Sequence, residues 1–220
     1  MESYYNPLPG IDSQMVNMNP TLTSPHTEFT LPFYQTRESM QDVDTYRLFL
    51  KNVEKRFRSS VRYTNYKSFL YSLGLYRCQI HGYITKDMAP IEMHHAILTL
   101  FDIALMITEH ELNTKGYVTT FRIVKLLKEE HAQHHIPLIM LSETPHQLYH
   151  NESAFFLHPD MCFGNWQYLI SKYRCGLTQD VAFKLLYYLK KAVELKGTDD
   201  SGLLNLRDQI LCWRDQYGLE

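Results

Sequence analysis

The sequence predicts a mainly α-helical protein of the α+β class. Most of its apolar side chains recur three or four residues apart, which is the spacing of a buried helix face. Two short segments, residues 91–95 and the wholly apolar 138–141, instead have the length of strands. With 45% hydrophobic and 21% charged residues among 220, the chain can bury one core and carry appendages.

The N-terminal part divides into two segments. Residues 1–38 are rich in Pro, Asn, Thr and Ser and show no periodicity, so we expect an extended or disordered arm. Residues 39–75 are expected to form a basic helical segment, with one helix to about Arg58 and a second from about Tyr63 until Gly74 ends it. The apolar positions that give the first helix its spacing are Tyr46, Phe49, Val53 and Phe57.

The remaining chain also divides in two. Residues 76–151 contain both strand-like runs, with helices inserted between them. Residues 97–107 are apolar nearly all round, which predicts a helix buried on most of its surface, and an amphipathic helix is expected at 118–132. Residues 152–220 are expected to form a helical C-terminal region. Its two expected helices span residues 181–195 and 203–217.

Charge and cysteine usage limit the function classes. The formal net charge is −2, so any contact with DNA must come from a local patch. The four cysteines lack metal-ligand spacing, which favours reduced thiols in an intracellular, cytoplasmic protein. The chain begins without a basic stretch followed by an apolar run, and its longest apolar stretch, residues 96–108, is too short to span a bilayer. We therefore expect neither secretion nor a membrane partner.

A local basic patch lies between residues 47 and 77. Its cations alternate with tyrosines and are opposed by one carboxylate, Glu54. Lysine and arginine supply sequence-independent affinity for phosphates, and aromatic rings stack on exposed bases. An ordinary solvated helix face with its aromatics in the core would give the same pattern, and the sequence does not separate the two. The candidate nucleic-acid-binding residues are Lys51, Lys55, Arg56, Arg58, Arg62 and Lys67.

Two histidine clusters are the most informative feature of the chain. His146 and His150 are four residues apart, so a helix that begins at Pro145 projects both from one face, within reach of one cation. His94 and His95 are adjacent, so on an extended segment they point to opposite sides. One of them can then bind the metal while the other faces a substrate. This division of roles indicates metal-assisted hydrolysis.

The order of these segments resembles the HNH or His-Me finger endonuclease family in its colicin-like form. In that family a strand with two adjacent histidines, here His94 and His95, is followed by a second strand and then by a helix with His-x-x-x-His, here His146 and His150. The resemblance covers residues 76–151 and implies a ββα-metal core. It implies that His94, His146 and His150 hold one divalent metal ion: Mg²⁺, Mn²⁺, Ni²⁺ or Zn²⁺. His95 would then be the general base. The implied reaction is hydrolysis of phosphodiester bonds in DNA, with RNA as the other possible substrate.

The chain departs from this family at one informative position. Pro137 stands where the family usually has its middle Asn, whose side chain holds the loop that orients the base; proline has neither an amide side chain nor a backbone donor. His134 or His135 could replace it by hydrogen bonding into the same loop. Glu92 lies on the strand face of His94, so its carboxylate could orient a ligand imidazole, although a solvent-facing carboxylate would fit the pattern equally well.

Other interpretations of the same residues stay open. One is a catalytically degenerate protein of this fold that binds nucleic acid or a protein partner, for which Pro137 is the evidence. Another is a structural helical protein, for instance of a virus, whose arm at residues 1–38 docks on a protein partner or on a second copy; a phage origin fits by family association. A hydrolase of small molecules lacks support, because the chain has no phosphate-cradling glycine loop, no His-Glu-x-x-His and no nucleophile elbow.

Overall fold

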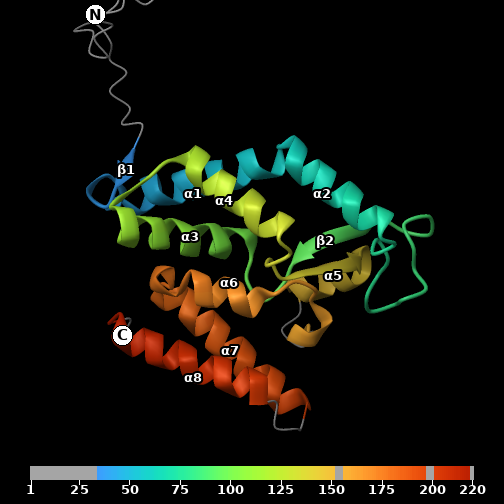
Figure 1. Cartoon of the computed structure of the whole chain (residues 1–220). Coiled ribbons are helices and arrows are strands. Elements are labelled where there is room, and N and C mark those ends of the chain that lie inside the picture. The colour runs from blue at the N-terminus through green and yellow to red at the C-terminus, as the bar shows by residue number, and fades with distance from the viewer. Residues whose placement is uncertain (1–33, 152–155, 197–200, 219–220) are drawn as a thin grey trace, which may run out of the picture. The chain divides into compact units, whose positions relative to one another are not determined.

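The computed structural model describes residues 34–151, 156–196 and 201–218. In these ranges the protein is mainly helical, with two small two-stranded antiparallel sheets (Figure 1). The predicted α+β, mainly helical class is thereby confirmed. The expected arm at residues 1–33 lies outside the described residues. No helix of the described chain is long and apolar enough to cross a membrane.

The folded unit begins earlier than the sequence indicates. Strand β1 (Gln35–Thr36) pairs antiparallel with β3 (Tyr117–Val118), and a 3-10 helix, η2 (Glu38–Met40), follows it. Residues 34–38, which were expected to belong to the arm, are therefore part of the fold. A two-residue strand has no periodicity of its own and exists through its distant partner, so local composition does not reveal it.

Two helices occupy the segment in which they were expected. Helix α1 (Val43–Arg58) begins after Asp42, whose side chain accepts a hydrogen bond from the backbone N–H of Thr45. Helix α2 (Val61–Ser72) begins after Ser60, whose hydroxyl accepts one from the N–H of Tyr63. Each cap satisfies a backbone donor that the first helical turn leaves unpaired.

A ββα unit forms the middle of the chain. Strand β2 (Ile91–His95) pairs antiparallel with β4 (Leu138–Ser142), and helix α5 (Glu143–Asn151) follows β4 directly. Helices α3 (Leu100–Lys115) and α4 (Thr120–Ala132) are inserted between the two strands. Every residue of β4 is buried, so this strand belongs to the core.

Helix α3 begins at Leu100, later than the start expected at residue 97. Ile97 has a φ of 67°, a left-handed conformation that a helix cannot contain. Thr99 and Asp102 then form a reciprocal capping box, which fixes the first turn. Residues 97–99, which were expected to begin the helix, precede it, and Ile97 and Leu98 are apolar because they are buried. The helix ends at Gly116, which has a φ of 78°.

Helix α3 is the central element of the core, as its sequence suggests. Figure 1 shows α1 and α4 on one side of it and the C-terminal helices on the other. Five side chains that are no more than 1% exposed come from five different elements and belong to one apolar cluster. They are Val53, Ile103, Ile123, Leu138 and Leu185.

The C-terminal region is helical, as expected. The two helices expected from periodicity are present as α7 (Gln179–Lys196) and α8 (Ser201–Gln216). The structure adds α6 (Trp166–Lys172), which is too short for periodicity to indicate, and the 3-10 helices η3 (Pro159–Met161) and η4 (Arg174–Gly176).

A buried carboxylate ties this region to α4. Glu130 is fully buried and accepts hydrogen bonds from Lys172 Nζ at 2.5 Å and from the Tyr173 hydroxyl at 2.7 Å. Nδ1 of His135 lies 2.7 Å from its other oxygen. These bonds outweigh the effect of burial and keep the pKa of Glu130 below its ordinary value. Because a buried charge is tolerated only when it is fully paired, this cluster fixes how α6 meets α4.

Replacing Gly176 by Ala should destabilise the protein, because η4 packs directly on α3 at this glycine. A Cβ atom there would overlap the carbonyl oxygen of Met106 and lie 2.5 Å from the amide nitrogen of His110. We expect the free energy of unfolding to fall by about 1–3 kcal/mol or more in urea denaturation. Gly82→Ala is the control, since a Cβ at Gly82 has no neighbour within 4 Å. Equal stability of the two variants would contradict this packing.

Candidate metal centre

Three histidines of the ββα unit face one another. His94 comes from β2, and His146 and His150 come from α5. One ring nitrogen of each lies within 4.8 Å of the others. Nε2 of His146 and Nε2 of His150 are 3.2 Å apart, close to the roughly 3.3 Å between two nitrogens that bind one tetrahedral ion at about 2.0–2.1 Å. The arrangement therefore fits three ligands of a single ion.

His94 contributes a buried ring nitrogen that has no hydrogen-bond partner among the described residues. Its side chain is nearly buried, and the atom without a partner is Nε2. A buried polar atom without a partner lowers the stability of the folded protein by about 1–3 kcal/mol. A metal ion bound here, beside two further imidazoles, would remove this cost. Burial, with the neighbouring His146 and His150, lowers the pKa of His94 to about 4. The ring is therefore neutral at neutral pH, in the form that binds metals.

Glu92 lies where the sequence suggests it could orient a ligand. Its carboxylate oxygen is 3.2 Å from Nδ1 of His146. When the carboxylate accepts a hydrogen bond from Nδ1–H, the lone pair of Nε2 remains for a metal, which is the usual arrangement behind a histidine ligand. Nε2 is also the nitrogen that faces His150.

The local sequence explains how α5 presents its two histidines. The helix begins at Glu143, two residues before the start expected at Pro145, so the proline lies in the first turn. Proline is tolerated there because its missing N–H would have no partner within the helix. His146 is half-buried and His150 is exposed. One side of the three-histidine cluster is thus accessible, and a tetrahedral ion there would keep one position open.

His95 faces the opposite side of β2, as strand alternation predicts. It is 5% exposed, and its Nε2 lies 3.1 Å from Nε2 of His131 on α4. Nδ1 of His131 lies 2.7 Å from the carbonyl oxygen of Leu127 and must donate to it, so Nε2 of His131 accepts the hydrogen bond from His95. The structure thus buries His95 behind a helix and does not present it to a substrate. Its role as general base stays a prediction.

Burial keeps both members of this histidine pair neutral. Burial, together with the smaller effect of nearby Arg58, lowers the pKa of His131 to about 4. The pKa of His95 is also well below its ordinary value, because the ring is buried and lies against His131. The rings of Phe57 and Tyr66 pack on His131, with centroids 4.5 and 5.6 Å away. The pair is therefore an uncharged part of the core.

The structure does not bring His134 or His135 to the three histidines. Nδ1 of His134 lies 3.3 Å from the hydroxyl of Tyr66 on α2, and Nδ1 of His135 bonds to the buried Glu130. The expected support of the metal site by these two residues is therefore not seen. They follow the end of α4, and the turn into β4 directs their side chains elsewhere.

The loop after the histidine doublet is held by the backbone. The N–H of Ala96 donates to the carbonyl oxygen of Pro137, at 3.2 Å. Proline lacks a donor but keeps its acceptor, so it serves this position although it cannot supply an amide side chain.

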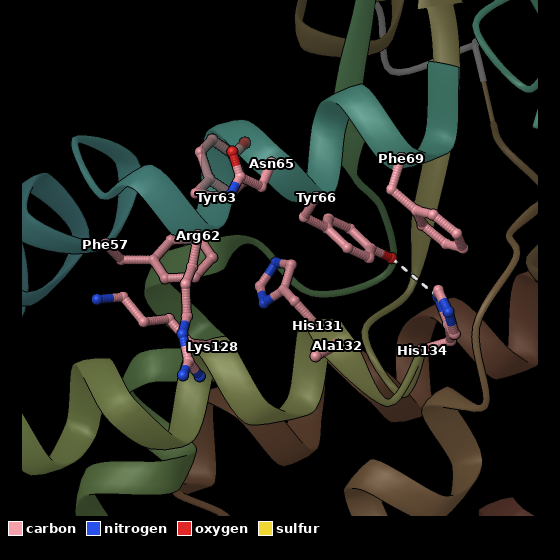
Figure 2. A pocket seen from close by; sticks show the side chains of 10 residues that line it. All are labelled: Phe57, Arg62, Tyr63, Asn65, Tyr66, Phe69, Lys128, His131, Ala132 and His134. Atoms are coloured by element: carbon pink, nitrogen blue, oxygen red, sulfur yellow. Dashed lines mark hydrogen bonds between the residues drawn. The ribbon is translucent and has the colours of Figure 1, made fainter. Parts of the chain in front are cut away.

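The six candidate nucleic-acid-binding residues lie on α1 and α2 and are exposed or half-exposed. Two of them contact aromatic rings: Arg56 lies over Phe121 at 5.3 Å and Lys67 over Tyr63 at 5.1 Å. Arg62 lines a pocket between α2 and α4 (Figure 2). The sequence identified these cations but not the pocket, because its other wall comes from a helix about sixty residues further along the chain.

The neutral state of His131 should make the protein less stable in mild acid. In the unfolded chain a histidine has a pKa of about 6.5, whereas the folded value is about 4. Between these values the unfolded state binds more protons, so the free energy of unfolding should fall as the pH falls from 6.5 to 4, by a few kcal/mol in total. Urea denaturation in EDTA at stepped pH measures this.

His131→Gln should flatten the pH dependence of stability, and replacement of the exposed His81 by Gln should not. An identical slope in wild type and His131→Gln would show that another group causes the acid sensitivity.

Comparison with known proteins gives one result. A family model described as "Bacteriophage G278-like virion protein" matches residues 14–213. No curated protein and no solved structure matches the chain. The matched range includes both sheets and all three clustered histidines. The expected phage association is thereby confirmed, and the chain belongs to the family of bacteriophage G278-like virion proteins.

Proposed function

We propose that this virion protein binds one divalent transition-metal ion through His94, His146 and His150. The observation that carries the proposal is the buried Nε2 of His94, which has no partner among the described residues and lies beside two more imidazoles. Three nitrogen ligands favour Zn²⁺ or Ni²⁺ over Mg²⁺, which prefers oxygen. The fourth position would be free for water or for a group from another molecule.

A bound ion would have a structural effect that suits a virion component. Helix α5 has nine residues, which is too short for a helix to be stable on its own in water. An ion held by β2 and α5 would fasten the helix to the sheet. Because the ion binds the folded state, it would raise stability by about 2.7 kcal/mol when present at a hundred times its dissociation constant.

A second candidate function is hydrolysis of phosphodiester bonds in DNA or RNA. It is supported by the order of the two strands and the helix, and by the accessible side of the three-histidine cluster. The metal would polarise the phosphate and activate a bound water molecule. The buried position of His95 argues against its acting as the base, so this activity ranks below metal binding alone.

If the three histidines bind the metal, isothermal titration with Zn²⁺ should show that the variants lose zinc affinity to different extents. Wild type should bind one ion per chain. Glu92→Gln should weaken binding roughly 10- to 100-fold, because it removes the carboxylate behind His146. His146→Ala and His150→Ala should each lose more than that, since each removes a ligand. The control is His81→Ala, at an exposed histidine outside the cluster. Unchanged zinc affinity in His146→Ala and His150→Ala would rule out this site.

Nuclease activity can be tested separately with supercoiled plasmid and single-stranded RNA, in Mg²⁺, Mn²⁺, Ni²⁺ or Zn²⁺. If the metal site hydrolyses phosphodiesters, wild type should cleave and His146→Ala should not. His95→Gln then tests the predicted base, provided that its melting temperature shows a folded protein. Cleavage retained by His95→Gln would exclude His95 as the base. Absence of cleavage by wild type would leave metal binding as the function of the site.

A further inference from the structure

A pocket of about 390 Å³ opens between α2 and α4, on the side of the protein where His95 meets His131. Its lining residues come from the end of α1, from α2, from α4 and from His134, which follows α4 (Figure 2). The volume is at the lower end of the range of small-molecule sites, about 300–1,000 Å³. The metal centre uses none of these lining residues.

The walls of the pocket are largely flat rings. Tyr63, Tyr66 and Phe69 lie three residues apart along α2 and line one wall, and His131 and His134 line the other. Phe69 is 44% exposed, so its ring is accessible to a ligand in the pocket. An accessible aromatic ring suits a planar ligand, and a nucleobase stacked on an aromatic ring is a common solution.

Two cations lie together at one end of the pocket. Figure 2 shows Arg62 of α2 and Lys128 of α4 at the same end, with His134 at the other. Neither cation has an ion-pair partner among the described residues, and no carboxylate lines the pocket. A third cation, Lys67, lies over the ring of Tyr63 at 5.1 Å. Such an end is suited to an anion, and the arginine fork matches a phosphate.

The backbone of His134 has a strained conformation. Helix α4 ends in a Schellman motif, in which the N–H of His135 bonds to the carbonyl of Glu130 and the N–H of His134 to that of His131. The residue at the left-handed position of this motif is normally glycine, but here it is His134, with a φ of 55°. Its carbonyl is held by the N–H of Asn165, at 2.7 Å. Strain of this kind is concentrated at binding sites.

We propose that this pocket binds one unpaired nucleotide of a single-stranded nucleic acid. The base stacks on the exposed ring of Phe69, which His134 supports with ring centroids 5.8 Å apart, and its phosphate lies against Arg62 and Lys128. A duplex is excluded, because its bases are stacked on one another and cannot stack on Phe69 in the pocket. The site is independent of the proposed metal centre, so metal need not be present for binding.

The test is fluorescence anisotropy of the full chain in EDTA, with a short labelled oligo-dT strand and a duplex of equal length. Wild type should bind the single strand more tightly than the duplex. Phe69→Ala removes an exposed ring and should weaken binding roughly 5- to 100-fold, the range for loss of one base–aromatic stack. The double variant Arg62→Ala/Lys128→Ala should bind at least about 10-fold more weakly and lower the salt slope by roughly 0.7, the value for one phosphate that is no longer neutralised.

Two controls separate this site from general charge and from folding defects. Arg47→Ala/Lys190→Ala removes the same charge at two exposed cations outside the pocket and should leave the affinity nearly unchanged. His134→Gly removes the ring and relieves the left-handed strain, so it should weaken binding without lowering the melting temperature.

Three outcomes would overturn the proposal. The first is equal affinity of wild type for single strand and duplex. The second is undiminished binding by both Phe69→Ala and the double variant, which would place any contact elsewhere. The third is displacement of the strand by free thymidine monophosphate at equal concentration, which would make a free nucleotide the ligand.

Discussion

The antiparallel register of β2 and β4 decides which histidine meets which helix. His94 is opposite Ile139 and His95 is opposite Leu138, so the two imidazoles leave the sheet on opposite faces. One face meets α5 and brings His94 to His146 and His150. The other meets α4 and brings His95 to His131. A slip of one residue would exchange the two and destroy both arrangements.

This register also connects the two proposed sites. The metal centre and the pocket lie on opposite faces of one small sheet, and their nearest links are the adjacent residues His94 and His95. His131, which lines the pocket, is fixed by its bonds to His95 and to Leu127. The sheet is anchored in the core, because β4 is buried along its full length. Each site can therefore act on its own while both depend on the same pairing.

Sequence patterns revealed those features whose cause is local. Helical spacing located α1 and α2, and strand alternation with the four-residue histidine spacing located the cluster of His94, His146 and His150. Features that need a distant partner were missed. Strand β1 exists because β3 lies beside it, His95 is buried because α4 crosses its face, and the pocket exists because α4 runs beside α2. The spacing of residues within one segment cannot predict these contacts between distant elements.

The charge balance limits what nucleic-acid contact such a protein can make. With a formal net charge of −2, the whole molecule gains nothing from approaching a polyanion, so long-range attraction cannot hold a strand along its surface. Attraction must come from a few cations at short range, and much of the affinity must come from stacking, which salt does not screen. The pocket has both, because Arg62 and Lys128 line one end of it and the exposed ring of Phe69 lines the other. If the pocket binds as proposed, a virion protein of this composition would hold a single unpaired nucleotide and would not coat a genome.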